Sequence, residues 1–358
     1  MDKLFWERSL VTVVLVLFAT IRFPKVVAVN GKIPALFAFG DSILDTGNNN
    51  NILSSTKCNY PPYGRDFPGA VPTGRCCNGK TPTDLIAMAL GIKDSVPAYL
   101  SGNLSPQDLA TGVCFASAGS GIDDQTARLL ATISQPAQLQ MFREYIGKLT
   151  AAVGQQQATQ IISDGVFLVS AGNNDIAITF TSLALAVPFP IYSAGLVSTA
   201  SNFFKSIYAL GARKVWVLST LPLGCLPGGR LVAGGPLRAC AVFENMLAQS
   251  FNGQLSTAVN SIRASYSDYD IRFIDVYTPL YNIIQNPQAS GFEDVADACC
   301  GTGPFKTAGL CNLLVVCPNP STYVFWDFAH PTERAYRLVV DSILQSNSMN
   351  INASTLSN

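Results

Sequence analysis

The chain has 358 residues, of which 48% are hydrophobic and 13% are charged, and its basic and acidic residues balance to a formal net charge of zero. This length and composition allow a large buried core and indicate a globular protein. The balanced charge argues against nucleic acid and anionic lipid as partners, because both attract proteins through basic surfaces.

The first 28 residues have the pattern of a secretory signal peptide. Lys3 and Arg8 precede an apolar run at 10–19, and small or compact residues follow at 26–28, where a signal peptidase would cleave. The run is too short to span a bilayer comfortably, and further basic residues follow it, so we expect a cleaved signal at 1–28 rather than a retained anchor. The sequence therefore predicts a secreted, extracellular protein with no integral membrane span.

Five short runs rich in Val, Ile and aromatic residues predict strands that are buried on both faces of a parallel sheet. Helical spacing lies between the runs, as in Phe203, Ile207 and Leu210 before Gly211, and the alternation predicts an α/β fold. No internal repeat or linker divides the chain, so we expect one domain over 29–345 and a polar C-terminal tail at 346–358. The five runs cover residues 35–39, 113–116, 166–169, 215–218 and 272–276.

Small and polar residues directly follow the first three runs. They occupy 40–42 after the first run, 117–121 after the second and 170–175 after the third. Functional groups of open parallel sheets gather at the carboxyl ends of the strands. These three segments are therefore candidates for one common site.

His330 is the only histidine of the chain, and it lies three residues after Asp327 in "WDFAHPTERAY". A lone histidine is often an ordinary core or surface residue, but this offset can place the Asp327 carboxylate on one ring nitrogen and leave the other facing a serine. Pro331 is suited to the first turn of the following helix. Asp327 would raise the pKa of His330 and the helix N-terminus would lower it. We expect activity to fall on acidification near or somewhat below about pH 6.5.

Ten cysteines in a secreted chain predict disulfides rather than metal sites. One cysteine cluster near the C-terminus contains no histidine, so we expect two disulfides within it instead of a zinc site. That cluster consists of Cys299, Cys300, Cys311 and Cys317. The other expectations are that Cys225 pairs with Cys240, that Cys58 pairs with Cys76 or Cys77, and that Cys114 is a buried free thiol.

Four sequence blocks in a fixed order resemble the plant GDSL esterase/lipases of the SGNH hydrolase superfamily, and in particular their extracellular lipase branch. The blocks are "FAFGDSILDTGNNN", "GVCFASAGSGID", "VSAGNNDIA" and "YVFWDFAHPTERAY", supported by "NYPPYGRDFP", "PTGR" and "GARKVWVLSTLPLGCLP". The resemblance runs from about Pro34 to Gln345. One departure is "GRCCNGK" at 74–80, where relatives usually read Gly-Arg-Phe-Ser-Asn-Gly.

The resemblance implies a flavodoxin-like three-layer αβα sandwich with a five-stranded parallel sheet, which is the SGNH hydrolase fold. Ser42 matches the nucleophile of this family, and Asp327 and His330 match the rest of its Ser-His-Asp triad. The oxyanion hole would consist of the backbone N–H groups of Ser42 and Gly119 and the side-chain amide of Asn174.

One residue near the expected site is an alternative member of it, and the others are expected to have structural roles. Gly121 lies close enough to Gly119 in the same block to replace it in the oxyanion hole. Asp41 and Asp45 are expected to hold the turn around Ser42, because small polar side chains readily bond their own backbone. The asparagine tract at 48–51 is expected to be loop scaffolding.

The implied activity is hydrolysis of small-molecule acyl esters or lipids through an acyl-enzyme, with no metal and no cofactor. Two alternatives remain. An acyltransferase would use the same residues with an alcohol in place of water. A non-catalytic secreted scaffold would retain the fold alone, although the intact triad residues and Asn174 count against it.

Overall fold

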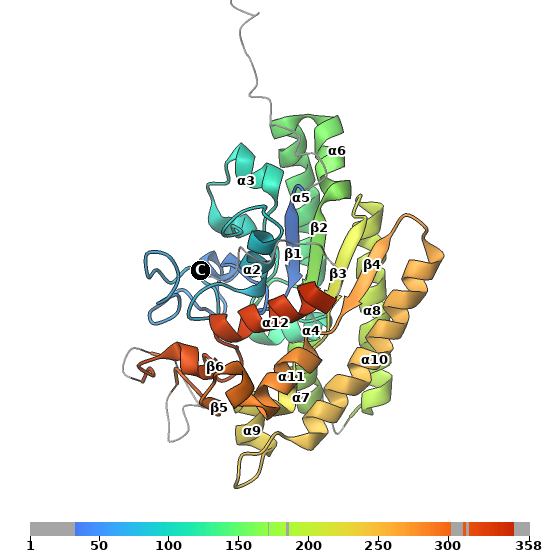
Figure 1. Ribbon diagram of the computed structural model, residues 1–358. Coiled ribbons are helices and arrows are strands. Elements are labelled where there is room, and N and C mark those ends of the chain that lie inside the picture. Colours follow the sequence, from blue (N-terminus) through green and yellow to red (C-terminus); the bar gives the residue numbers. More distant parts are fainter. Residues whose placement is uncertain (1–32, 171, 184–185, 302–310, 313–314, 347–358) are drawn as a thin grey trace, which may run out of the picture. The chain divides into compact units, whose positions relative to one another are not determined.

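The computed structural model describes residues 33–170, 172–183, 186–301, 311–312 and 315–346 (Figure 1). Residues from Ile33 onward form one compact unit. The expected signal peptide at 1–28 and the expected tail beyond Ser346 lie outside the described residues. Among the helices that are described, none is both long and apolar enough to cross a membrane.

Four of the five predicted strands form a parallel sheet. They are β1 (Leu36–Gly40), β2 (Val166–Ser170), β3 (Lys214–Leu218) and β4 (Asp270–Ile274), and they lie side by side in that order. Every residue of β1 and β2 is buried. The continuous apolar runs of the sequence therefore correspond to strands covered on both faces.

The predicted fifth strand at 113–116 is reduced to isolated parallel bridges of Cys114, one to Ala38 of β1 and one to Ala98. Its outer edge is occupied by other groups. The side-chain amide of Asn48 donates to two carbonyl oxygens of this run, at 2.9 and 2.8 Å, and the N–H of Cys114 donates to the Pro97 carbonyl at 2.9 Å. Toward β1, the N–H groups of Phe115 and Ala116 both donate to the Ala38 carbonyl, at 2.7 and 3.1 Å, so the regular alternation is interrupted, and the prediction of five regular strands is corrected to four with isolated bridges.

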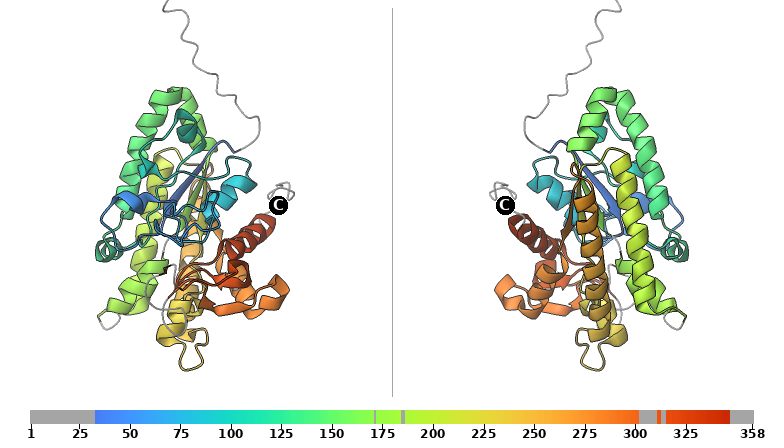
Figure 2. Two further views of the ribbon diagram at one scale, coloured as in Figure 1. Left: turned by 90° about the vertical axis from the view of Figure 1, so that its left-hand side faces the viewer. Right: turned by 90° about the vertical axis from the view of Figure 1, so that its right-hand side faces the viewer.

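Helices cover both faces of the sheet (Figures 1 and 2). On one face, α5 (Gln135–Val153) and α8 (Phe189–Ala209) place Phe142 and Phe203 against Phe39 of β1, with ring centroids 5.6 and 5.5 Å apart. The helix α10 (Val242–Ser265) packs beside α8. The other face carries α2 (Pro82–Ala89), α11 (Tyr277–Gln285) and α12 (Glu333–Ser346). This arrangement is the predicted three-layer αβα sandwich.

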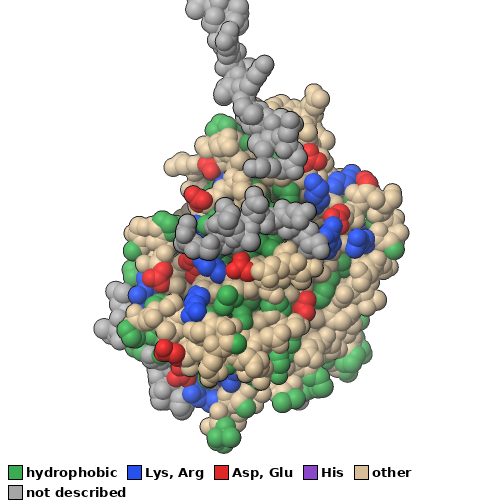
Figure 3. Space-filling view, in the orientation of Figure 1, with side chains coloured by type: hydrophobic (Ala, Val, Ile, Leu, Met, Phe, Trp, Pro, Cys, Tyr) green, Lys and Arg blue, Asp and Glu red, His purple; other side chains and the backbone are tan. Residues whose placement is uncertain are grey.

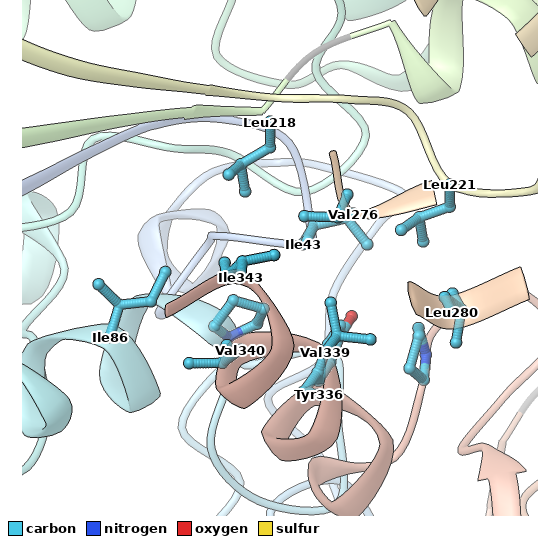
Figure 4. Close-up of a pocket in the computed structure, with 12 residues that line it drawn as sticks. Ile43, Ile86, Leu218, Leu221, Val276, Leu280, Tyr336, Val339, Val340 and Ile343 are labelled. Atoms are coloured by element: carbon cyan, nitrogen blue, oxygen red, sulfur yellow. The ribbon is translucent and has the colours of Figure 1, made fainter. Parts of the chain in front are cut away.

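The interior between the sheet and α2, α11 and α12 contains a small cavity (Figure 4). Buried apolar side chains line it, among them Ile43, Leu218, Val276 and Val339. Ile43 follows Ser42 directly, so the turn after β1 rests on an apolar floor. Shorter helices lie in the connections: α3 (Pro106–Thr111), α4 (Asp124–Leu130), α6 (Gln155–Asp164), α7 (Thr181–Leu183) and α9 (Pro227–Ala233).

The start of the last helix differs from the prediction. Pro331 pairs with Phe325 in an isolated antiparallel bridge, and α12 begins two residues later at Glu333. The backbone N–H of Thr332 donates to the Val324 carbonyl, which keeps this stretch beside the preceding strand. Pro331 therefore belongs to the loop and not to the first helical turn.

A second, two-stranded parallel sheet formed by β5 (Asp294–Ala298) and β6 (Tyr323–Phe325) precedes the loop of His330. Two disulfides join the cysteine cluster around it, Cys299–Cys317 and Cys300–Cys311, as predicted. The expected Cys225–Cys240 pair is present, and the partner of Cys58 is Cys76. Cys77 and Cys114 are buried free thiols, which confirms the expectation for Cys114.

Candidate active site

Ser42 lies in the turn that follows β1. At the end of the strand, Gly40 has a φ of +120°, and a Cβ added there would stand 1.6 Å from the carbonyl oxygen of Ser170. Only glycine allows the chain to leave the sheet this close to β2. Ser42 itself remains partly exposed next to this crowded strand end.

Buried carboxylates hold the turn around Ser42. Asp41 accepts hydrogen bonds from the Ile43 N–H at 3.1 Å, the Ser170 hydroxyl at 3.0 Å and the Asn173 amide at 2.9 Å. Asp45 accepts from the N–H groups of Gly47, Asn48 and Ala118. Both aspartates therefore have the turn-holding contacts that the sequence predicts.

The asparagine tract forms the short 3-10 helix Asn48–Asn51, and its side chains bond to other loops. Besides the bonds of Asn48 to the Cys114 bridge, the Asn49 amide donates to the Ala118 carbonyl at 2.8 Å. These contacts tie the turn after β1 to the segment that contains Gly119. The tract is loop scaffolding, as expected.

His330 connects Ser42 to Asp327. Nε2 of the imidazole lies 2.8 Å from Oγ of Ser42, and Nδ1 lies 2.8 Å from each carboxylate oxygen of Asp327. An ionised carboxylate can only accept, so Nδ1 carries the proton in the neutral ring and Nε2 is left to accept from the serine hydroxyl. The structure thus brings together three side chains that are up to 288 residues apart in the sequence.

Tyr63 is a site residue that the sequence argument did not find. Its hydroxyl donates to Oδ2 of Asp327 at 2.8 Å, while the N–H groups of Ala329 and His330 donate to Oδ1 at 2.9 and 2.8 Å. Burial and the charge of Asp327 hold the pKa of Tyr63 well above its ordinary value, so the hydroxyl stays a donor. The available signal was the block "NYPPYGRDFP", which contains Tyr63.

Electrostatics favour an ionised Asp327 beside a basic His330. Burial alone would raise the pKa of Asp327, but the charge of His330 and the hydrogen bonds to the carboxylate outweigh burial and lower it. Burial alone would lower the pKa of His330, but the charge and hydrogen bond of Asp327 outweigh burial and raise it. The raised pKa of His330 therefore favours a midpoint above the ordinary histidine value, and not near or somewhat below it. The opposing helix dipole is weakened because α12 starts beyond the loop with the acidic Glu333.

Two adjacent asparagines at the end of β2 have different environments. Asn173 is buried and uses both ends of its amide, donating to Asp41 and accepting from the Leu221 N–H at 2.9 Å. Asn174 is half-buried and donates one hydrogen bond, to the Ser120 carbonyl at 2.9 Å. Each amide NH₂ group has two donors and uses one of them, but Asn174 is partly exposed, so its second N–H is accessible to a ligand, whereas Asn173 is buried and bonded at its oxygen as well.

The two glycines of the neighbouring loop also differ. A Cβ on Gly121 would stand 2.3 Å from a carboxylate oxygen of Asp175, which accepts from the N–H groups of Ile122 and Asp123. Packing against Asp175 therefore explains Gly121. Gly119 has a φ of +83°, a conformation that favours glycine, and it lies in the part of the loop that Asp45 and Asn49 hold next to the turn of Ser42. No group of three or more potential metal ligands occurs among the residues with described positions.

Comparison with known proteins places this arrangement in a family. A family model described as GDSL-like Lipase/Acylhydrolase matches residues 36–343. A GDSL esterase/lipase of Arabidopsis thaliana is 48% identical over 322 residues, which cover 89% of this chain and 90% of that protein. GDSL esterase/lipase EXL3 of the same plant is 45% identical over 316 residues, covering 87% of each. An extracellular lipase structure from Streptomyces rimosus covers 87% of this chain and 99% of its own, at 14% identity and a TM-score of 0.36.

The fold and site define an α/β protein with a serine, a histidine and an aspartate in contact at the carboxyl end of a parallel sheet. The match to the family model and the Arabidopsis relatives then identify the family. The chain belongs to the GDSL-like lipase/acylhydrolase family.

Proposed function

We propose that the protein is a secreted serine ester hydrolase that cleaves carboxylic esters of lipids or of other small acyl compounds. Ser42 is the nucleophile, His330 is the general base, and Asp327 orients His330. One observation carries the proposal: His330 lies 2.8 Å from Ser42 through Nε2 and 2.8 Å from Asp327 through Nδ1. Membership in a family described as lipases and acylhydrolases supports it.

The reaction has two halves. Nε2 of His330 takes the hydroxyl proton while Oγ of Ser42 bonds to the ester carbonyl carbon, and the proton then passes to the alcohol as its C–O bond breaks. In the second half, His330 deprotonates a water molecule that attacks the acyl-enzyme, and the proton returns to Ser42 as the acid leaves. Asp327 stays ionised throughout, because its pKa is lowered, and it stabilises the imidazolium in both halves.

The carbonyl oxygen becomes negatively charged in both halves. The backbone N–H groups of Ser42 and Gly119 and the uncommitted amide N–H of Asn174 stabilise this charge. One such donor is typically worth about 3 kcal/mol of transition-state stabilisation. The assignment of Gly119 rather than Gly121 is supported by the contact of Gly121 with Asp175.

The proposal extends to the whole chain. A signal peptide at 1–28 directs secretion, the hydrolase domain covers 29–345, and 346–358 is a polar tail. Four disulfides among the described cysteines support an oxidising, extracellular location.

A series of chromogenic esters of increasing acyl length, applied to the secreted protein and to Ser42→Ala, tests the proposal. We expect the parent to hydrolyse at least the short esters and to form a covalent adduct with a serine-directed phosphonate. Ser42→Ala should lose both properties and keep the thermal unfolding midpoint of the parent. Turnover by Ser42→Ala at the parental rate would refute the nucleophile assignment. Release of acyl product only when an alcohol is added would instead identify an acyltransferase.

A further inference from the structure

Residues 231–246 form a surface that we call the apolar protrusion. It comprises the end of α9, the loop that follows and the first turns of α10, and it projects at the lower edge of the view, where hydrophobic side chains gather in Figure 3. Its most exposed side chains are Val232 at 85%, Leu237 at 92% and Val242 at 82%. Leu231, Phe243 and Met246 are also exposed. These six side chains are the majority of the exposed large hydrophobic side chains among the residues described.

All residues of the protrusion are described, and none of its fully exposed side chains is polar, while Arg238 and Glu244 are partly exposed. Each exposed position between 231 and 246 is a hydrophobic residue, alanine, proline or glycine. Its polar residues are less exposed than its apolar ones. Arg238 pairs with Asp297 at 2.5 Å, and the buried Asn245 accepts from the Gly224 N–H at 2.9 Å. A protein partner ordinarily finds about one hydrogen bond for each 100–200 Å² of interface, and these side chains offer none. Lipid hydrocarbon requires none.

The base of the protrusion is fixed, so its apolar side chains are held in solvent. The Cys225–Cys240 disulfide closes the segment, and the Ala241 N–H donates to the Gly224 carbonyl at 2.7 Å. Inside it, the buried Arg230 guanidinium donates to the carbonyls of Cys225 and Arg238 at 2.8 and 3.0 Å. These links prevent the loop from folding back to bury its own hydrophobic side chains.

The protrusion is continuous with the site of Ser42. The helix α9 follows β3, so it emerges at the same end of the parallel sheet as Ser42 after β1. The N–H of Gly228 in α9 donates to the carbonyl of Phe328 at 2.8 Å. Phe328 lies between Asp327 and His330, is half exposed, and has its ring 6.5 Å from the His330 ring. A surface that contacts the protrusion and Phe328 together therefore borders the catalytic histidine.

We propose that the apolar protrusion inserts into the surface of a lipid aggregate and holds the active site against it. A rigid group of exposed Leu, Val, Phe and Met side chains, whose Arg238 is paired with Asp297, suits insertion at the boundary between headgroups and acyl chains. The attraction is apolar rather than electrostatic, which agrees with the zero net charge of the chain. This inference rests on the proposed function, since the lipid surface is where the esters that Ser42 attacks would lie.

The test uses flotation with phosphatidylcholine vesicles, and every protein carries Ser42→Ala so that no ester is consumed. The test variant adds Val232→Ser, Leu237→Ser and Phe243→Ser. The matched control adds Leu53→Ser, Leu129→Ser and Ile191→Ser, three exposed apolar side chains on other parts of the surface. Because all six side chains are exposed, both variants should unfold at the temperature of the parent. We expect the parent and the control to float equally at low and high salt, and the test variant to bind at least about tenfold more weakly.

A second arm uses the same triple variants with Ser42 intact. Turnover of a dissolved short-chain ester should be unchanged, while turnover of esters held in vesicles should fall about in proportion to binding. Equal flotation of test and control variants, or no flotation of the parent, would overturn the inference. The inference would also be overturned if, in sedimentation, the parent dimerised without floating on vesicles while the test variant stayed monomeric. Flotation is measured without turnover, so a failure of the proposed hydrolysis would not be mistaken for a failure to bind lipid.

Discussion

Ser42 and His330 are joined by a hydrogen bond, but they belong to two regions that are stabilised in different ways. Ser42 follows a strand of the central sheet, and buried hydrogen bonds that Ser170 and Asn173 donate to Asp41 hold its turn against β2. His330 follows the two-stranded sheet, where two disulfides join the chain around β5 and β6. The first region takes its rigidity from the hydrophobic core and the second from covalent links. The site should therefore respond differently to changes in packing and in oxidation.

The largest expected effect separates two neighbours in the core-supported region. Asn174→Ala should lower kcat by roughly a hundredfold with little change in KM or in thermal stability, because only a transition-state donor is lost. Asn173→Ala should instead lower the free energy of unfolding by about 1–3 kcal/mol, because Asp41 and the Leu221 N–H lose a buried partner. Steady-state kinetics and thermal unfolding of both variants check this. A hundredfold kinetic loss at Asn173 with none at Asn174 would show that the two roles are exchanged.

The next effect tests the disulfide-supported region. The N–H groups of Cys299 and Cys300 donate to the carbonyls of Phe325 and Trp326, immediately before Asp327. Replacing Cys299 and Cys317 by serine should cost about 3 kcal/mol of stability. It should also slow phosphonate labelling of Ser42 in the protein that remains folded, because His330 loses its fixed position.

The matched control replaces Cys225 and Cys240, which close a loop of similar length that reaches the histidine loop through the hydrogen bond from Gly228 to Phe328 but does not bond to the backbone just before Asp327. It should lose stability to a similar degree and keep the labelling rate of its folded fraction. Labelling rates and denaturant titrations are measured side by side. If both pairs slow labelling equally, the cysteine cluster has no special role in placing His330.

A smaller effect is expected from loss of the hydrogen bond that Tyr63 donates to Asp327. Tyr63→Phe removes one of the donors to its carboxylate, so the remaining charge acts more strongly on the imidazolium and raises the pKa of His330 further. We expect kcat/KM to fall roughly fivefold, equivalent to about 1 kcal/mol, and the acidic limb of its pH profile to move upward. Tyr208→Phe is the control, because Tyr208 donates to Asp268 on the surface at 2.7 Å. If the pH profile of Tyr63→Phe is the same as that of the parent, Tyr63 does not act on the pKa of His330 and contributes only packing.

The smallest effect concerns the parent protein and is the shift in the pH at which its activity falls on acidification. The proposed base is neutral imidazole, and Asp327 raises the pKa of His330, so protonation starts at a higher pH than for a free histidine. Activity should therefore be complete at alkaline pH and should fall, as pH decreases, through one midpoint above about 6.5. A profile of kcat/KM against pH measures it. A midpoint clearly below 6.5 would mean that burial outweighs the contact with Asp327.

Much of the fold was predictable because its signals are local. Continuous apolar runs identified the four strands of the central sheet, and helical spacing identified α8 and its end before Gly211, whose φ is +109°. The run at 113–116 forms isolated bridges and not a regular strand, because the N–H groups of Phe115 and Ala116 share the Ala38 carbonyl. That irregularity depends on how the run meets β1 and leaves no mark in the run itself.

The site was predictable to the extent that it depends on short spacing. The Asp327–His330 contact spans three residues, and its geometry is as expected. Tyr63 contacts Asp327 across 264 residues, and no periodic pattern carries such a contact. The different environments of Asn173 and Asn174 also arise from distant partners. Within the cysteine cluster, the sequence predicted two disulfides, but the pairing depends on how β5 and β6 come together.

The adjacent Cys76 and Cys77 have a consequence for oxidative folding. Only Cys76 pairs with Cys58, at a separation of 18 residues, although a loop one residue longer would cost almost the same closure entropy in the unfolded chain. Choice between the two sulfurs therefore depends on the fold. Burial raises the pKa of Cys77 well above its ordinary value and places its thiol 3.6 Å from the Pro331 carbonyl, where a reactive thiolate does not form. The segment beside His330 that covers Cys77 therefore also keeps its thiol from exchanging with the Cys58–Cys76 bridge in the folded protein.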